Sequence, residues 1–509
     1  MSLLSQLCPF TFGCNVFTLG IIFTLLFLLL DFMKRRKPCT DFPPSPPSWP
    51  FVCNLLQMDF RDLNNGFKQL SKQYGDVMSL QVFWKSMVVL NGFEVIKEAL
   101  IQKSEDTADR PPFNLYEILG FVGNNKGVLL ANYGQSWKDL RRFTLSTLKD
   151  FGMGKKSLEE RVGEEAGYLC DAFQSEQGGP FDPHVLINTA VSNVICSIIF
   201  GERFEYDDHK FLKLLCLIEE SIKAESGPVP QIISSLPWSS KVPGLARLFF
   251  QPRIHMLQYL QEIINEHKQT WDSGHTRDFI DAFMLEMKKA KGVKDSNFND
   301  QNLLLIIADL FAAGTETTTT TLRWGLLFML LYPDVQRKVQ EEIDQVIGRT
   351  RKPTMGDVLQ MPYTNAVIHE IQRYADIIPL SVPHMTYRDT HIKGFFIPKG
   401  TVIMTNLSSV LKDEKVWEKP FQFYPEHFID RDGKFVKREA FMAFSAGNNN
   451  DTYTKLEKAL EHELLTSHLP SSIRHKSGSV WVRDLLCILI YSTGIGPIIQ
   501  NAQDQGYSG

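Results

Sequence analysis

The chain has 509 residues, of which 43% are hydrophobic and 22% are charged, and its net charge is −4. This composition is typical of a globular protein rather than a disordered one, and the charge gives no indication of a nucleic-acid partner. The eight cysteines are sparse and include no CxxC pair. The sequence therefore predicts neither a disulfide framework nor a zinc site.

The N-terminal segment is strongly apolar. Residues 1–30 contain no charged side chain, and the run from Val16 to Leu30 is nearly all apolar. With residues 10–13 before it, this stretch is long enough to cross a bilayer, which takes about 20 residues. The basic cluster at 34–37 should stay on the cytoplasmic side. We therefore expect residues 1–37 to be a transmembrane helix with a basic stop. A cleaved signal peptide is the weaker alternative, because no basic region precedes the apolar run.

A proline-rich segment, residues 38–50, follows the predicted anchor. Prolines at the density found between Pro43 and Pro50 resist helix and sheet and favour a stiff extended chain. We expect this segment to act as a hinge that holds the body at a fixed attitude to the membrane. An SH3-type ligand is the alternative use.

The body, residues 51–447, is predicted to be mainly α with a minor β-sheet. Apolar periodicity indicates helices over most of the chain as far as Tyr374, and short strand-like pieces alternate with turns from Ile378 to about Val410. The clearest early elements are a helix at Leu63–Tyr74, strands at Val77–Val82 and Ser86–Leu90, and a later helix at Tyr363–Tyr374.

One long helix is expected from Asp300 or Asn302 to Leu331, and it stops at Pro333. It is apolar nearly all round, which predicts burial. Gly314 and the threonines around it are poor helix formers, so we expect a local functional distortion there. Glu316 beside Thr317 would suit proton delivery to a bound oxidant. The alternative is a flexible core helix.

Two further segments are informative when they are considered together with this helix. Glu370 and Arg373 lie at i, i+3 on one helix face, and Pro425-Glu426-His427-Phe428 follows some fifty residues later. In this order the three segments resemble the cytochrome P-450 family, with its oxygen-activating helix, its ExxR motif and its PxxF segment. The resemblance implies the cytochrome P-450 fold, with Ala313 and Gly314 beside haem and with Glu370, Arg373 and His427 as a structural interlock below it.

Other segments match the same family. Trp137 and Arg141 resemble its WxxxR helix, and Arg110 and His384 match further partners of the haem propionates. Cations facing buried carboxylates make physical sense, because an unpaired buried charge is costly. The resemblance runs to Gly447 and is closest to the vertebrate 2D subfamily, as in residues 298–300, 333–337 and 407–414.

The subfamily resemblance also implies a substrate site. Members tend to favour amines held by buried acids; Asp309 matches one such acid, and Glu225 is expected to match the other. Asp309 has an alternative role, as a carboxylate that accepts hydrogen bonds from the backbone of a neighbouring loop. The two roles are compatible.

The family pattern breaks after Gly447. Counted without gaps, Asn449 falls on the expected propionate arginine and Asp451 on the cysteine that binds iron, and Cys487 downstream lies in no matching motif. Thiolate donation to iron favours O–O cleavage, so no metal ligand is assigned and weak haem retention is expected. Residues 448–509 are an unrelated tail that leaves the catalytic domain incomplete; a splice form and a faulty gene model are both open.

Three functions remain open. The first is a haem-dependent monooxygenase that acts on small apolar or amine compounds at the cytosolic face of the endoplasmic reticulum membrane. The resemblance implies NADPH-dependent cytochrome P-450 reductase as its partner, with cytochrome b5 as a second candidate. The next is a catalytically inactive, membrane-bound isoform, favoured by the absent cysteine at residue 451. The last is an apolar-ligand binding protein, which nothing in the sequence specifically supports.

Overall fold

The computed structural model describes residues 18–30 and most of residues 41–446, with short internal gaps and one longer gap at 226–241. The predicted basic stop at 34–37, the first residues of the proline-rich hinge, Asn449, Asp451 and the whole tail lie outside the described residues.

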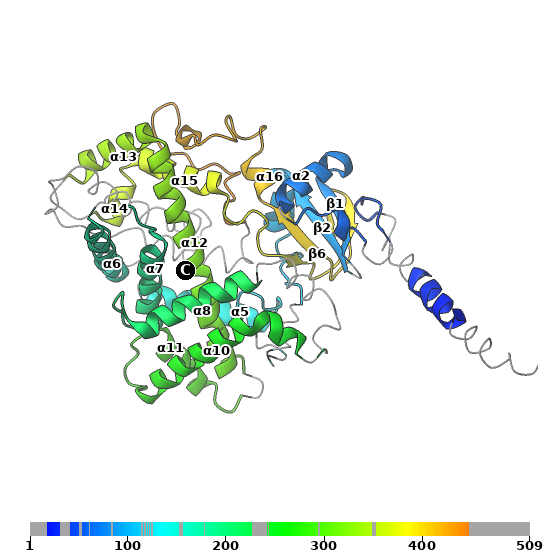
Figure 1. Ribbon diagram of the computed structural model, residues 1–509, viewed down its shortest axis with the longest axis horizontal. Coiled ribbons are helices and arrows are strands. Elements are labelled where there is room, and N and C mark those ends of the chain that lie inside the picture. Colours follow the sequence, from blue (N-terminus) through cyan, green and yellow to red (C-terminus); the bar gives the residue numbers. More distant parts are fainter. Residues whose placement is uncertain are drawn as a thin grey trace, which may run out of the picture.

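The described part of the predicted anchor is a helix over residues 18–30, blue in Figure 1. Its large apolar side chains are exposed, with Phe23 and Phe27 the most exposed of them. Over the described residues, no helix combines the length and the apolarity that a membrane crossing needs.

The body is mainly helical, as predicted, and Figure 1 shows most of its helices grouped on one side of the molecule. The helix predicted at Leu63–Tyr74 is present with those bounds, and its N-cap Asp62 accepts a hydrogen bond from the backbone N–H of Asn65. The α-helices are α2 (Leu63–Tyr74), α3 (Phe93–Lys97), α5 (Gln135–Asp150), α6 (Lys156–Ser175), α7 (His184–Ile199), α8 (His209–Glu225), α10 (Leu245–Gln269), α11 (Phe279–Lys289), α12 (Asp300–Leu331), α13 (Pro333–Val346), α14 (Met355–Val358), α15 (Pro362–Ala375) and α16 (Ser408–Leu411), with a π-turn η2 (Glu98–Gln102) and 3-10 turns η1 (Leu55–Gln57) and η4 (Pro425–Phe428).

A small sheet lies beside the helices (Figure 1). Its strand order is β1-β2-β6-β3, in which β2 and β6 are parallel and the other neighbours are antiparallel. A separate pair, β4 and β5, forms a short antiparallel ladder. The minor sheet and the strands predicted near residues 77–90 and 378–410 are therefore confirmed. The strands are β1 (Val77–Val82), β2 (Lys85–Asn91), β3 (His384–Met385), β4 (Thr390–Ile392), β5 (Phe395–Ile397) and β6 (Val402–Asn406).

Helix α12 runs through the helical region as a single element (Figure 1). Most of its side chains are buried, and its N-cap Asn299 accepts a hydrogen bond from the N–H of Asn302. The distortion predicted around Gly314 is wrong, because the backbone is α-helical from Asp300 to Leu331. Two of the threonine hydroxyls bond along the helix: Thr317 Oγ1 donates to the carbonyl of Ala313 at 2.7 Å, and Thr321 Oγ1 donates to that of Thr317 at 2.9 Å.

Candidate functional site

Glu370 and Arg373 form the most deeply buried ion pair described for this chain. Arg373 Nε and Nη2 donate to the two carboxylate oxygens of Glu370, each at 2.7 Å, and both side chains are 0% exposed. Arg373 Nη1 also donates to the carbonyls of Leu411, at 2.7 Å, and Pro420, at 2.9 Å. The pair therefore fastens α15 to the chain that follows α16.

The start of α15 is fixed by a carboxylate from another helix. Pro362 occupies the first helical position, where a missing N–H costs nothing. Glu342 of α13 accepts hydrogen bonds from the backbone N–H groups of Tyr363, at 3.0 Å, and Thr364, at 2.6 Å. An anion at a helix N-terminus is favourable, so these contacts set the position of the helix that carries Glu370.

His427 of η4 completes this cluster. Its Nε2 accepts a hydrogen bond from the backbone N–H of Lys419 at 3.1 Å, so that nitrogen carries no proton. The proton must then lie on Nδ1, which donates to Glu370 Oε2 at 3.2 Å. The residues expected to interlock, Glu370, Arg373 and His427, are thus brought together by the fold.

The chain after η4 packs against the same helix. Phe441 lies 5.0 Å from the ring of His369, centroid to centroid, and 5.4 Å from that of Phe428. Burial lowers the pKa of His369 to about 4, so its imidazole is neutral at physiological pH, and its Nδ1 donates to the carbonyl of Asn365. His369 was missed by sequence reasoning, although it directly precedes Glu370.

Two expected propionate partners, Arg110 and His384, lie side by side. The segment before Arg110 pairs with β3 through two backbone hydrogen bonds between Asp109 and Met385. His384 Nδ1 donates to the carbonyl of Thr107 at 2.9 Å, and Arg110 Nη1 donates to the carbonyl of Pro383 at 3.0 Å. Both side chains are buried.

The other two expected partners, Trp137 and Arg141, lie on α5. The guanidinium of Arg141 sits 5.3 Å from the centroid of the Trp137 ring. The indole N–H of Trp137, expected to meet a propionate, instead donates to the carbonyl of Val128 at 3.0 Å. Asp109 links this helix to Arg110, because its Oδ1 accepts from the N–H of Tyr133 just before α5 and from that of Arg110. The four residues therefore share one region.

These residues fit only part of a haem group. The buried guanidinium of Arg110 and the side chain of the half-buried Arg141 suit the carboxylates at the edge of a porphyrin. The cysteines of the described chain, however, lie at 53, 170, 196 and 216, and none of them is in residues 441–446, where the expected ligand loop begins. The described residues thus supply a cationic edge but no thiolate for iron.

The predicted proton-handling pair lies on α12. Thr317 is buried and its hydroxyl donates to the carbonyl of Ala313, while Glu316 is half-buried and accepts from Thr320 Oγ1 at 3.5 Å. Thr315 faces the other way and exchanges a hydrogen bond with Ser192 of α7 at 3.2 Å. Glu316 and Thr317 are thus adjacent but are not hydrogen-bonded to each other in any contact described.

Asp309 has the alternative role that the sequence left open, because it accepts hydrogen bonds from the backbone of a neighbouring loop. Its Oδ2 accepts from the N–H groups of Val128, at 2.9 Å, and Leu129, at 3.0 Å. Its Oδ1 is buried without a hydrogen-bond partner among the described residues. Burial raises the pKa of Asp309 to about 6, against the opposing effect of the two backbone bonds and of the charge on Arg253. Gly127 permits this approach, because a Cβ there would lie 2.5 Å from Oδ2.

Glu225, the other expected substrate acid, is at the end of α8. Its Oε1 accepts a hydrogen bond from Ser221 at 3.0 Å and lies 3.8 Å from Nε of Arg253 on α10. Arg253 is buried, and sequence reasoning missed it. The only signal for it is a single basic residue directly after Pro252, inside an otherwise amphipathic stretch.

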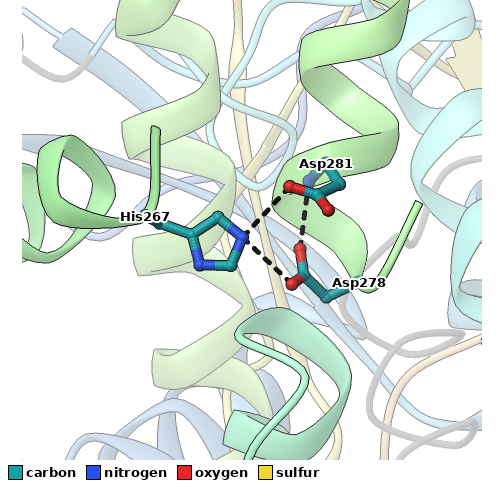
Figure 2. A group of neighbouring side chains, drawn as sticks. All are labelled: His267, Asp278 and Asp281. Carbon is teal, nitrogen blue, oxygen red and sulfur yellow. Dashed lines mark hydrogen bonds and ion pairs between the residues drawn. The ribbon is translucent and has the colours of Figure 1, made fainter. Parts of the chain in front are cut away.

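A separate cluster joins the end of α10 to the start of α11. His267 Nε2 lies 3.0 Å from Asp278 Oδ2 and 3.2 Å from Asp281 Oδ1. Figure 2 shows the imidazole facing the two carboxylates. The ligand atoms are close enough to hold a metal ion, yet Arg277 donates to both carboxylate oxygens of Asp281, at 2.7 and 2.9 Å. A guanidinium in that position already satisfies the charge, so we assign this cluster a structural role at the cap of α11.

Comparison with known proteins places this site in context. A family model described as Cytochrome P450 matches residues 43–450. Cytochrome P450 2D6 of Pan paniscus is 51% identical over 460 residues, which cover 89% of this chain and 93% of that protein. Cytochrome P450 2D4 of Rattus norvegicus is 53% identical over 429 residues, covering 84% and 86%, and Cytochrome P450 2D15 of Canis lupus familiaris is 52% identical over 437 residues, covering 86% and 87%.

Proposed function

Because this chain belongs to the cytochrome P450 family, whose members bind haem iron, we propose that its body is built for monooxygenation of the xenobiotic type. The reaction would insert one atom of O2 into small apolar or amine compounds. The observation that carries this proposal is that the fold gathers two sets of family residues. The four expected propionate partners lie in one region, and the three interlocking residues meet elsewhere on the same scaffold. The first set is Arg110, His384, Trp137 and Arg141, and the second is Glu370, Arg373 and His427.

The family implies a redox partner and a small-molecule substrate. We propose NADPH-dependent cytochrome P450 reductase as the electron donor, with cytochrome b5 as a second one, at the cytosolic face of the endoplasmic reticulum membrane. The apolar N-terminal run and the exposed side chains of helix 18–30 support membrane attachment. Glu316 and Thr317 are the proposed proton carriers, since they lie next to each other on α12.

A second function is favoured by one specific observation. Asp451 stands where the family has its iron-binding cysteine, and Asn449 stands at the expected arginine. A chain without the thiolate would lack the donation that favours O–O cleavage. The second proposal is therefore a catalytically inactive, haem-deficient form that keeps the anchor and the substrate-binding body.

One spectrum separates the two proposals. The full chain is expressed, extracted in mild detergent, and its reduced carbon-monoxide difference spectrum is recorded. A thiolate-type Soret band would exclude the inactive form, whereas a chain without bound haem would exclude the monooxygenase. The matched control is a chimera in which the residues after Gly447 are replaced by the corresponding segment of the rat relative. If the body is competent, the chimera shows the thiolate-type band; a chimera without haem contradicts the role proposed for the body.

A further inference from the structure

Arg253 is a buried cation placed by a break in its helix. Pro252 lies inside α10, and Phe250, two residues earlier, has non-helical backbone angles, φ −111° and ψ 15°. Proline in a helix interior removes a hydrogen bond and kinks the helix. Only 8% of the surface of Arg253 is exposed. Figure 1 shows α8 and α10 lying across α12, and the three helices contact one another.

The groups around Arg253 come from separate parts of the chain. Glu225 of α8 forms an ion pair with it at 3.8 Å, and buried Tyr116 hydrogen-bonds to it. Asp309 of α12 is close enough for its charge to act on the guanidinium. Burial opposes the charged form, but these groups outweigh it and raise the pKa of Arg253, so it stays charged at every physiological pH. Arg253 therefore lies near both acids that were expected to hold an amine, Glu225 and Asp309.

The distance between Arg253 and Glu225 leaves a hydrogen-bond donor unused. At 3.8 Å the pair is an ion pair but too long for a hydrogen bond. Nε of Arg253 is buried and has no hydrogen-bond partner within the part of the chain that the structure describes. A buried donor without a partner is costly, and a ligand with an acceptor oxygen would relieve that cost. An ammonium group would instead bring a second positive charge to a buried cation.

We propose that Arg253 is a specificity-determining residue that neutralises Glu225 and makes this chain bind neutral, acceptor-bearing apolar ligands in preference to protonated amines of the same shape. The proposal deepens the proposed function, since it rests on Glu225 and Asp309 lining the substrate site. The expected substrates included both amines and neutral compounds, and the proposal restricts them to neutral compounds. It applies equally to a chain with or without haem, because the ligand contacts are protein side chains.

The test uses a pair of probes that differ in charge but hardly in size, 4-phenylbutanol and 4-phenylbutylamine. Binding of each to the full chain in mild detergent is measured by titration calorimetry at pH 7.4, where the amine is protonated. The parent is expected to bind the alcohol at least tenfold more tightly than the amine. Arg253→Gln should raise amine affinity at least tenfold, and Arg253→Lys, which keeps the charge, should leave the preference for the alcohol in place.

The result would differ if the ion pair between α8 and α10 were purely structural. Arg253→Gln would then change the stability of the protein but leave the ratio of the alcohol and amine affinities unchanged, and that result overturns the proposal. Adding Glu225→Gln to Arg253→Gln should remove the gain in amine binding. If Arg253→Gln does not fold, Glu225→Gln alone serves as the second variant and should lower amine affinity about fivefold relative to the alcohol.

The remaining outcomes are also decisive. A parent that binds the amine as tightly as the alcohol, or that binds neither probe, contradicts the proposal. The carbon-monoxide spectrum of the same preparation reports on haem independently. A chain without haem that still prefers the alcohol refutes the monooxygenase and supports the role of Arg253, while a chain with a thiolate-type spectrum and no preference does the reverse.

Discussion

Glu370 and Arg373 meet through two parallel hydrogen bonds of 2.7 Å where neither side chain has any exposed surface. The same guanidinium also donates to three carbonyls, those of Leu411, Pro420 and Gln422. Five hydrogen bonds to one buried cation satisfy all its donors, which is the condition under which burying a charge is tolerable. The pair therefore holds the folded chain together between α15 and η4.

Arg373→Ala should destabilise the protein by about 3–5 kcal/mol, because it leaves Glu370 as an uncompensated buried charge. Chemical denaturation of the purified chain measures this change. The matched control is Arg337→Ala on α13, whose partner Glu341 lies at 2.9 Å with both side chains more than half exposed. The control should cost about 0.5 kcal/mol or less. Equal effects of the two substitutions would show that the buried pair is not a structural lock.

His427 is predicted to act through both ring nitrogens. Its Nδ1–H donates to Glu370 and its Nε2 accepts from the N–H of Lys419. His427→Arg can replace the first bond but has no acceptor for the second, so it should cost about 1 kcal/mol. His427→Leu loses both and should cost about 2–3 kcal/mol. Thermal unfolding of the three proteins gives the order, and a His427→Arg variant as stable as the parent would disprove the assigned tautomer.

Asp309 should make stability depend on pH. Its raised pKa means that the folded protein favours the neutral carboxyl, so the parent carries an unfavourable buried charge above about pH 6. Raising the pKa from 3.8 to about 6 corresponds to about 3 kcal/mol. Asp309→Asn should therefore gain stability relative to the parent by up to that amount between pH 4.5 and pH 8, measured by denaturant titration. Asp207→Asn, at an exposed position, is the control and should show no such trend.

The sequence identified the elements whose signals are local. The bounds of α12 and α15 follow from apolar periodicity and from prolines at 333 and 362, and the structure reproduces them within a residue or two. Glu370 and Arg373 could be paired from their i, i+3 spacing alone. Within α12, however, the threonine run predicted a distortion from propensity alone, whereas the buried helix stays regular from Asp300 to Leu331 with Thr317 and Thr321 bonded to carbonyls four residues earlier.

Relationships between distant segments could not be read in this way. Arg253 precedes Asp309 by 56 residues and follows Glu225 by 28, and no pattern within one helix reveals that Arg253 pairs with Glu225 and lies within reach of the charge of Asp309. The indole N–H of Trp137 was expected to face a propionate, but a carbonyl nine residues earlier accepts it. Such contacts depend on how helices and loops pack, which pattern analysis of one sequence does not determine.

His267 should stabilise the fold at low pH and lose this contribution as the pH rises. The stability gained by Asp309→Asn should instead grow as the pH rises. Burial disfavours its charged form, but the hydrogen bond and charge of Asp278, helped by Asp281 and opposed by Arg277, raise its pKa above the usual 6.5. A raised histidine pKa stabilises the fold fully below pH 6.5, and the contribution is lost as the pH rises through the folded-state pKa. Arg277 lowers the pKa of Asp281 despite burial, so that carboxylate stays charged across this window. His267→Gln removes the titrating group and should cost about 2 kcal/mol near pH 5.5 and progressively less as the pH rises above 6.5. His255→Gln, at an exposed histidine on the same helix, is the control and should show no pH-dependent difference. Thermal unfolding of the three proteins from pH 5 to pH 9 measures the effect; a His267→Gln penalty that stays constant across this range would mean that the imidazole is bound in its neutral form throughout.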